Sequence, residues 1–424
     1  MKQAGWVALV ASIFATNTLP VGAVDSSDLR WSAEVFGRVD AARTQTLFNP
    51  DGSLLDGARN ESGLAMRGVG RWEAAALSAK FDGWIEARHT ANDDNVTGTL
   101  PEASLHWTPQ KGHTLSAGLS SFRWGTAYLW NPSNPLADSE LNNTGRARKY
   151  YRGGDRFIFY EVLAKQTTYL LAAVELTQRD ALLASPPQAE RWVVARIQHM
   201  FDASDAALHL ALREGEHFLG LSTSHTVGNA LALHGELSTR SQRRLPAWNN
   251  LPVGSPSTPP LPVWDTHARS RWTTSAVLGG QYTWDKGINL IVEYLYDGNG
   301  LDDREYAALR AAASDAGNLR NDPAFAETAD GFLLQANRYT GRMRRNYAFV
   351  RLAKDGLIVN TDVQAFARRG LDDDSWIFGW WLRRQVDEHY SLALSGEHLR
   401  GSDSGEALLV PVRDRYQISV KYDF

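Results

Sequence analysis

The last nine residues of the chain, 416–424, restrict the fold more than any other segment. Tyr416, Ile418, Val420, Tyr422 and Phe424 alternate strictly with polar residues. Successive side chains of a β-strand point to opposite faces of the sheet, so these five residues share one apolar face. A strand of this kind, ending on an aromatic residue, suits a sheet that closes with one face in lipid.

The same period-two alternation recurs along the chain, for example over residues 77–88, 231–238, 288–297 and 390–395. This period predicts strands with one buried face. The polar face often carries full charges, which fits a water-filled lumen better than a packed soluble core. A soluble β-sandwich or solenoid is the alternative, and it does not account for the aromatic terminus.

The alternation predicts eighteen strands, with sixteen as the alternative count. Their ranges are 30–42, 62–74, 77–89, 99–108, 113–124, 155–164, 168–179, 190–201, 206–214, 216–226, 230–241, 271–284, 288–298, 341–354, 357–369, 375–386, 390–400 and 413–424. Tight turns with Asx or Gly chemistry are expected at 202–205, 227–229, 285–287, 354–356 and 387–389. Longer loops are expected near 43–60, 90–98, 125–154, 180–190, 242–269, 299–339, 370–374 and 401–411.

Short turns on one rim and long loops on the other are typical of bacterial outer-membrane β-barrels. The predicted fold class is all-β, a single transmembrane antiparallel β-barrel over residues 24–424, with short periplasmic turns and long extracellular loops. The terminal strand resembles the one by which Gram-negative outer-membrane proteins are recognised for assembly. The resemblance implies that Tyr416, Ile418, Val420, Tyr422 and Phe424 form the assembly signal. It also implies outer-membrane lipid, lipopolysaccharide and the assembly machinery as partners.

The amino terminus predicts a cleaved secretory signal over residues 1–23. Lys2 supplies the positive charge, residues 6–15 form a short apolar core, and Val21, Gly22 and Ala23 suit a cleavage site. The apolar run is shorter than the roughly 20 residues that a membrane-spanning helix needs. The chain has no cysteine and a formal net charge of −4, which is not the footprint of a nucleic-acid-binding protein. We therefore expect an exported protein of the cell outer membrane.

Two long loops have distinctive compositions. Residues 245–264 include six prolines, which predicts an irregular, stiff excursion without regular strand. Residues 302–316 are rich in alanine, which predicts a short helix capped by Asp302 or Asp303 over the outer mouth.

The third long loop is the candidate functional segment. Residues 122–138 contain two Asn-Pro pairs and a high density of aromatic residues, among them Trp124, Tyr128 and Trp130. Such aromatics need a packing surface, and the barrel interior is the simplest one. The chain resembles porins in architecture, and in porins the third long loop folds inward and narrows the pore. The resemblance implies an inward-folding loop near residues 125–154.

The end of this loop is basic. It carries Arg146, Arg148, Lys149, Arg152 and Arg156. If these cations face the pore, they favour anions. If they face outward, they pair with lipopolysaccharide phosphates or neighbouring acids. Acids expected on the lumen side, such as Glu236 and Glu293, would partly neutralise them.

Catalysis is the rival class of function. His225 with Ser224, or His234 with Glu236 and Ser238, could form an acid–base row, since residues two apart on a strand share a face. No recognised lipase or protease motif surrounds them. The histidines lack metal-ligand spacing on a helix, so no cofactor or metal is expected.

The sequence therefore predicts a passive outer-membrane channel or exporter pore for a hydrophilic solute, more suited to anions. An outer-membrane hydrolase, and a closed barrel acting as scaffold or adhesin, are the alternatives. Homo-oligomerisation is left open.

Overall fold

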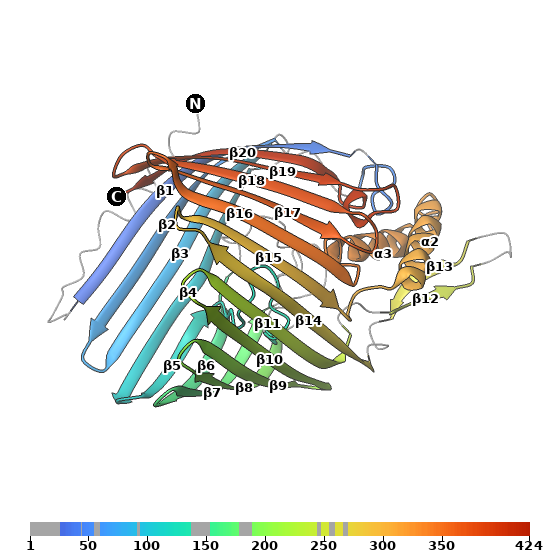
Figure 1. Ribbon diagram of the computed structural model, residues 1–424. Helices are drawn as coiled ribbons and strands as arrows, with labels where there is room; N and C mark the ends of the chain where they lie inside the picture. The colour runs from blue at the N-terminus through green and yellow to red at the C-terminus, as the bar shows by residue number, and fades with distance from the viewer. Residues whose placement is uncertain are drawn as a thin grey trace.

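The protein folds as a closed antiparallel β-barrel. The computed structural model describes residues 26–43, 45–54, 60–90, 94–136, 153–177, 189–243, 247–253, 259–265 and 270–424. Eighteen strands form one sheet, and the sheet closes because β1 pairs with both β2 and β20 (Figure 1). The prediction of an eighteen-strand barrel is confirmed. The predicted signal, residues 1–23, lies outside the described residues.

The barrel strands follow one another in chain order around the wall. They are β1 (Ser26–Ala42), β2 (Asn60–Ala74), β3 (Leu77–Thr90), β4 (Asp94–Gln110), β5 (His113–Ser120), β6 (Asp155–Ala164), β7 (Thr167–Thr177), β8 (Ala189–Met200), β9 (Ser204–Arg213), β10 (Glu216–Val227), β11 (Leu231–Gln242), β14 (Ser270–Thr283), β15 (Ile288–Asp297), β16 (Asn346–Ile358), β17 (Thr361–Gly370), β18 (Trp376–Gln385), β19 (Tyr390–Arg400) and β20 (Val412–Asp423). Outside the wall lie β12 (Ala247–Leu251), β13 (Leu261–Asp265), α2 (Asp303–Leu319), α3 (Ala326–Arg338) and the 3₁₀ turn η3 (Glu406–Leu408).

The two faces of the wall differ as the alternation predicts. On β15, Val292 and Tyr294 are 48% and 41% exposed, whereas Glu293 between them is 1% exposed. The outward face is thus an apolar belt, and the inward face is polar. A closed wall also pairs the backbone groups that lipid cannot satisfy. These are the properties of outer-membrane β-barrels, and the predicted transmembrane barrel is confirmed.

The two ends of the barrel carry different connections. The amino end of β1 and the carboxy terminus lie at the same end, opposite α2 and α3 (Figure 1). At the terminal seam the backbone amide of Phe424 donates a hydrogen bond to the carbonyl of Trp31 at 3.0 Å. Both ends of the barrel sheet therefore meet at the short-turn rim, as expected for an even number of strands.

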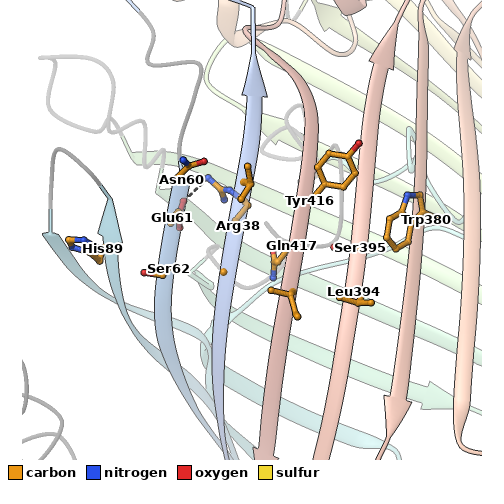
Figure 2. A pocket seen from close by; sticks show the side chains of 13 residues that line it. Arg38, Asn60, Glu61, Ser62, His89, Trp380, Leu394, Ser395, Tyr416 and Gln417 are labelled. Atoms are coloured by element: carbon orange, nitrogen blue, oxygen red, sulfur yellow. Dashed lines mark ion pairs between the residues drawn. The ribbon is translucent and has the colours of Figure 1, made fainter.

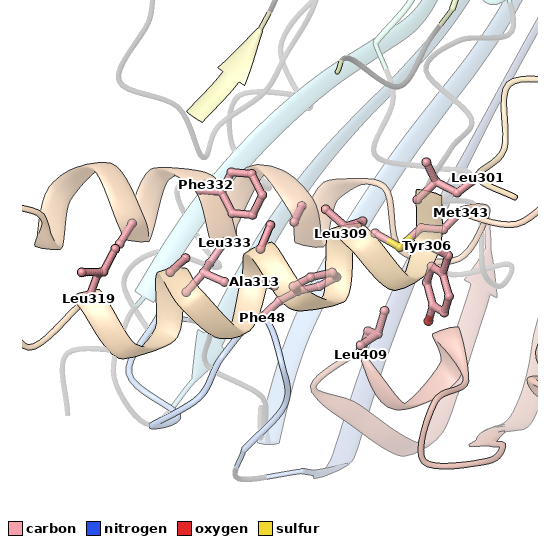
Figure 3. Close-up of a cluster of buried hydrophobic side chains, with 14 of the residues drawn as sticks. Phe48, Leu301, Tyr306, Leu309, Ala313, Leu319, Phe332, Leu333, Met343 and Leu409 are labelled. Atoms are coloured by element: carbon pink, nitrogen blue, oxygen red, sulfur yellow. The ribbon is translucent and has the colours of Figure 1, made fainter. Parts of the chain in front are cut away.

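Several long loops share a small apolar core beyond the barrel. Phe48 of the β1–β2 loop, Leu309 of α2, Leu333 of α3 and Leu409 of the β19–β20 loop are buried together (Figure 3). The hairpin β12–β13 packs against the same core, where Trp264 stacks on Phe332 with ring centroids 4.8 Å apart. The long-loop end is therefore a packed structure.

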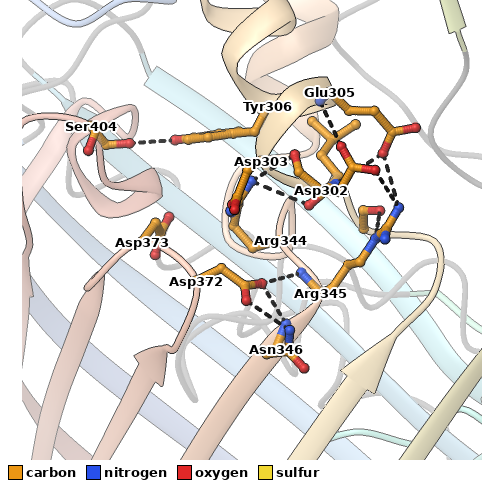
Figure 4. Close-up of polar contacts among 12 residues, drawn as sticks. Asp302, Asp303, Glu305, Tyr306, Arg344, Arg345, Asn346, Asp372, Asp373 and Ser404 are labelled. Atoms are coloured by element: carbon orange, nitrogen blue, oxygen red, sulfur yellow. Dashed lines mark hydrogen bonds and ion pairs between the residues drawn. The ribbon is translucent and has the colours of Figure 1, made fainter.

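The predicted helix is confirmed and is tied to the barrel rim by charges. Asp302 caps α2, and the side chains of Asp302 and Glu305 form a capping box. Arg345, directly before β16, approaches both carboxylates at 3.2 Å, and Arg243 donates to Glu305 at 2.7 Å. Asp372 accepts hydrogen bonds from the backbone amides of Arg345 and Asn346 (Figure 4). The sequence did not predict the second helix, α3.

Two sequence expectations are wrong in detail. The proline-rich segment was expected to exclude strand, but it forms the hairpin β12–β13, in which Pro262 lies opposite Asn250. A two-stranded hairpin has two open edges, and there a proline need not supply a ladder hydrogen bond. The turn expected at 354–356 lies instead after Ile358, because Gly356, at φ +65°, lies in a register shift within the strand pair.

Candidate functional site

The described start of the third loop, residues 121–136, packs against inward-facing side chains of the wall. Trp124 contacts His209 of β9 with ring centroids 6.1 Å apart. Leu136 is buried among residues of β6, β7, β8 and β10, whereas Trp130 packs against β16. The segment therefore runs along one side of the lumen.

One wall carboxylate holds both ends of a short stretch of this loop. Glu236 of β11 accepts hydrogen bonds from the backbone amides of Thr126 at 2.6 Å, Ala127 at 2.8 Å and Ser133 at 3.1 Å. It also accepts one from the Ser133 hydroxyl at 2.8 Å. An ionised carboxylate has room for four donors, and such charge-assisted bonds are about twice as strong as neutral ones.

A second wall carboxylate continues the same anchorage. Glu293 of β15 accepts hydrogen bonds from the backbone amides of Tyr128 and, at 2.9 Å, of Leu129. His234 of β11 contacts the same carboxylate through Nε2 at 2.9 Å. Four consecutive amides, 126–129, thus point at two buried acids, which fixes the direction of the loop backbone.

Glycines make this close approach possible. Gly125 has φ +127°, and a Cβ added there would lie 2.5 Å from Glu236 Oε1. Gly220 of β10 faces the loop, where an added Cβ would lie 2.5 Å from the Ser133 carbonyl oxygen. Larger residues at these positions would push the loop off the wall.

Aromatic packing completes the attachment. Tyr128 stacks on Phe349 of β16 with ring centroids 5.9 Å apart, and the guanidinium of Arg351 lies 4.9 Å from the Tyr128 ring centroid. Trp130 is 5% exposed and packs on Tyr347 and Phe349. Of these two aromatic residues, Tyr128 presents its side chain to the lumen, and Trp130 fastens the loop.

A polar space lies along the other side of the barrel. It has a volume of about 570 Å³ and is lined by β1–β3, by β17–β20 and by residue 355 of β16. Many of the charges near it are paired: Arg67 with Asp82 at 2.7 Å, and Arg383 with Asp362 at 2.7 Å. The lining therefore combines charges of both signs, with an excess of acids: Glu34, Glu86, Asp355, Asp362, Glu397 and Asp423 against Arg67, Arg383, Arg415 and Lys421.

Arg351 and Arg368 are different from these paired cations. They lie on the inward face of β16 and β17, beside the loop aromatics. Arg351 donates to Asn289 at 3.2 Å, and the Arg368 guanidinium lies 5.6 Å from the Tyr347 ring centroid. Within the described part of the chain, neither guanidinium has a carboxylate at salt-bridge distance. Nothing in the sequence distinguishes these two arginines from the other inward-facing cations.

The predicted basic residues divide into two groups. Arg146, Arg148, Lys149 and Arg152 lie outside the described residues. Arg156, a candidate pore residue whose orientation the sequence left open between pore and surface, faces outward. It shares the outward face of β6 with Ile158, and its guanidinium pairs with Glu175 at 3.0 Å. Arg191 of β8 binds the same carboxylate at 3.1 Å.

The acid–base rows considered for the rival function do not assemble. His225 and Ser224, as neighbours on a strand, point to opposite faces, and His225 instead contacts Ser204 at 2.7 Å. His234 is hydrogen-bonded to Glu293, whereas Glu236 binds the loop amides. Ser238 is buried on the same inward face without a histidine partner.

The described residues offer neither a metal centre nor a membrane-spanning helix. The described residues contain no group of three histidine or acidic side chains placed to hold a metal ion. No helix in the described ranges has the length and apolarity required to cross a membrane.

Comparison with known proteins supports the fold. The chain matches no protein-family model and no curated protein. Its structure is similar to that of OccAB1 from Acinetobacter baumannii, with a TM-score of 0.54 at 11% identity over 95% of this chain and 97% of that one. It is also similar to OccK5 (OpdH) from Pseudomonas aeruginosa, with a TM-score of 0.52 at 12% identity over 95% of this chain and 99% of that one. At such low identity the likeness shows the barrel fold alone.

Proposed function

We propose that the chain is an outer-membrane channel that passes a hydrophilic solute and prefers anions. The observation that carries this proposal is the third-loop segment held against Glu236 and Glu293. Because the segment is fixed to one wall, it narrows the lumen and leaves a polar passage beside it. Fixed charges around a narrow passage select solutes by sign without any catalytic step.

The preference for anions rests on Arg351 and Arg368. The Arg351 guanidinium lies over Tyr128 of the loop, and that of Arg368 lies over Tyr347, which Trp130 of the loop contacts. Within the described residues, neither has a carboxylate at salt-bridge distance. They raise the local concentration of anions. We further propose that the whole loop near 125–154 folds inward, so that Arg146, Arg148, Lys149 and Arg152 add to the same potential.

Planar-bilayer recordings test the proposal. The wild type should conduct and should prefer anions at low salt. The preference should weaken as the Debye length falls from about 10 Å at 0.1 M salt to roughly 3 Å at 1 M. Replacing Arg351 and Arg368 with Gln should move the reversal potential toward non-selectivity. Arg156→Gln, which changes an outward charge, is the matched control and should leave it unchanged.

The remaining loop is tested in the same recordings. Joint replacement of Arg146, Arg148, Lys149 and Arg152 with Gln should also reduce selectivity, and deletion of residues 127–150 should raise conductance. Unchanged conductance and reversal potential would place the loop charges outside the pore. A folded protein with no conductance would point to the closed scaffold.

A further inference from the structure

A charged cluster lies on the outside of the barrel, at the long-loop rim. Asp414 of β20 is bound by Arg400 at 2.6 Å, by Arg413 at 2.8 Å and by His398 at 3.0 Å. Asp414 shares its face of the strand with Tyr416, which is exposed on the apolar belt. The cluster therefore lies just above the lipid-facing surface.

Positive charge is in excess in this cluster. Arg43, directly after β1, donates hydrogen bonds to the backbone carbonyls of Leu399 and of three residues in the segment 407–412. Its burial and the neighbouring Arg400 and Arg413 lower the pKa of Arg43, so the three guanidiniums act on one another. Asp414 can neutralise only one of them. The side chains of Arg400 and Arg413 remain 49% and 53% exposed.

An apolar groove begins directly below the cluster. It has a volume of about 710 Å³, and Trp380, Leu394 and Tyr416 line it (Figure 2). Val39 and Ile418 belong to the same lining. The ring of His398 packs edge-on against Tyr416 at 5.4 Å, which joins the cluster to the groove.

The floor of the groove depends on a glycine. Gly37 of β1 lies opposite Ile418 of β20. A Cβ added at Gly37 would meet Ile418 Cγ2 at an ordinary 3.7 Å. The position therefore tolerates a side chain, yet it carries none, and the space stays open toward the lipid.

We propose that this cluster and groove form a binding site for one phosphorylated lipid of the outer leaflet. The lipid phosphate lies between Arg400 and Arg413, and an acyl chain occupies the groove. Guanidinium groups match phosphate oxygens in geometry and charge. The groove adds burial of apolar chain below the headgroup, in line with the barrel's own apolar belt.

Native mass spectrometry of the detergent-solubilised, heat-modifiable barrel tests the site. The probes are a bisphosphorylated acyl-disaccharide lipid and the same lipid without its phosphates. We expect the phosphorylated lipid to bind the wild type at least tenfold more tightly. Arg400→Gln with Arg413→Gln should remove this difference, which corresponds to about 1.4 kcal/mol.

Two further variants separate the site from general attraction at the rim. Gly37→Leu should weaken binding of the phosphorylated lipid while leaving all charges in place. Arg156→Gln with Arg191→Gln removes two outward arginines that also share one carboxylate, Glu175. This control pair should leave binding unchanged.

Several results would overturn the proposal. If the Arg156 and Arg191 variant loses as much binding of the phosphorylated lipid as the Arg400 and Arg413 variant, the attraction is unspecific. Displacement of the lipid by inorganic phosphate at the same concentration would show a site for free phosphate. Unchanged lipid binding in the Arg400 and Arg413 variant would exclude the cluster. A lipid-independent dimer abolished by Gly37→Leu would show that a second copy of the chain fills the groove.

Discussion

Glu236 and Ser133 are joined by two hydrogen bonds at the lumen wall, one from the Ser133 backbone amide at 3.1 Å and one from its hydroxyl at 2.8 Å. The same carboxylate also binds the amides of Thr126 and Ala127. The stretch 126–133 is therefore closed into a ring at one point of the wall. A single side chain thus determines whether this part of the loop stays in place.

We expect Glu236→Ala to release the loop. The substitution leaves three backbone amides and a hydroxyl without their acceptor, and each lost bond to a charged group costs about 1.5–3 kcal/mol. Single-channel conductance should rise and become noisier, and proteolysis within residues 121–136 should accelerate. Ser238→Ala, on the same inward face, is the control. Equal conductance in both variants would show that Glu236 does not hold the loop.

Much of the fold could be predicted because a barrel strand is a local pattern. Each strand needs only period-two alternation, and each turn needs only a few Gly or Asx residues. The same parity rule could have placed Arg156 correctly. Arg156 precedes Ile158 and Tyr160 at steps of two, so it shares their outward, lipid-facing side.

The anchorage of the loop could not be predicted in this way. Thr126 and Glu236 lie 110 residues apart, and Leu129 and Glu293 lie 164 apart. In the sequence the two acids look like any other lumen-side charges. Their role appears only when the barrel closes and brings β11 and β15 to the loop. Long-range pairing of this kind leaves no periodic trace in a single sequence.

We expect His234→Ala and the wild type to show the same absence of hydrolytic activity. His234 contacts Glu293, which keeps the amides of Tyr128 and Leu129 as partners. The purified wild type and variant should both show only background hydrolysis of ester and peptide substrates. Conductance should change less than in Glu236→Ala. Hydrolysis by the wild type that disappears in His234→Ala would support the hydrolase instead.

We expect deletion of Phe424 to reduce assembly. Its backbone amide bonds to the Trp31 carbonyl at the seam, and its ring packs edge-on against Tyr422 at 4.8 Å. Loss of both contacts weakens the last pairing that closes the sheet. The amount of heat-modifiable protein in outer-membrane fractions should fall, whereas Phe424→Tyr should keep it. If the deletion variant gives as much heat-modifiable protein as the wild type, Phe424 is not part of the assembly signal.

The last prediction concerns Glu406, in the β19–β20 loop at the outer rim. Its side chain is 2% exposed and accepts a hydrogen bond from the Tyr347 hydroxyl at 2.6 Å. Burial raises the pKa of Glu406 from its usual 4.5 to about 6. The nearby Asp373 also raises it, whereas Arg368 and the hydrogen bond from Tyr347 lower it. Between pH 4.5 and 6 the folded loop keeps a proton that the unfolded chain releases.

The contribution of Glu406 to the free energy of unfolding should therefore be highest below pH 4.5 and fall as pH rises through about 6. The loss should amount to about 2 kcal/mol, at 1.36 kcal/mol for each unit of pKa. Thermal melts of the purified barrel across this window measure it. Glu406→Gln cannot ionise, so it should flatten the dependence, whereas Glu388→Gln, in an exposed turn, should not. If the melting temperature of Glu406→Gln depends on pH as steeply as that of the wild type, another group titrates in this window. The buried carboxylate of Glu406 would then contribute nothing to the pH dependence of stability.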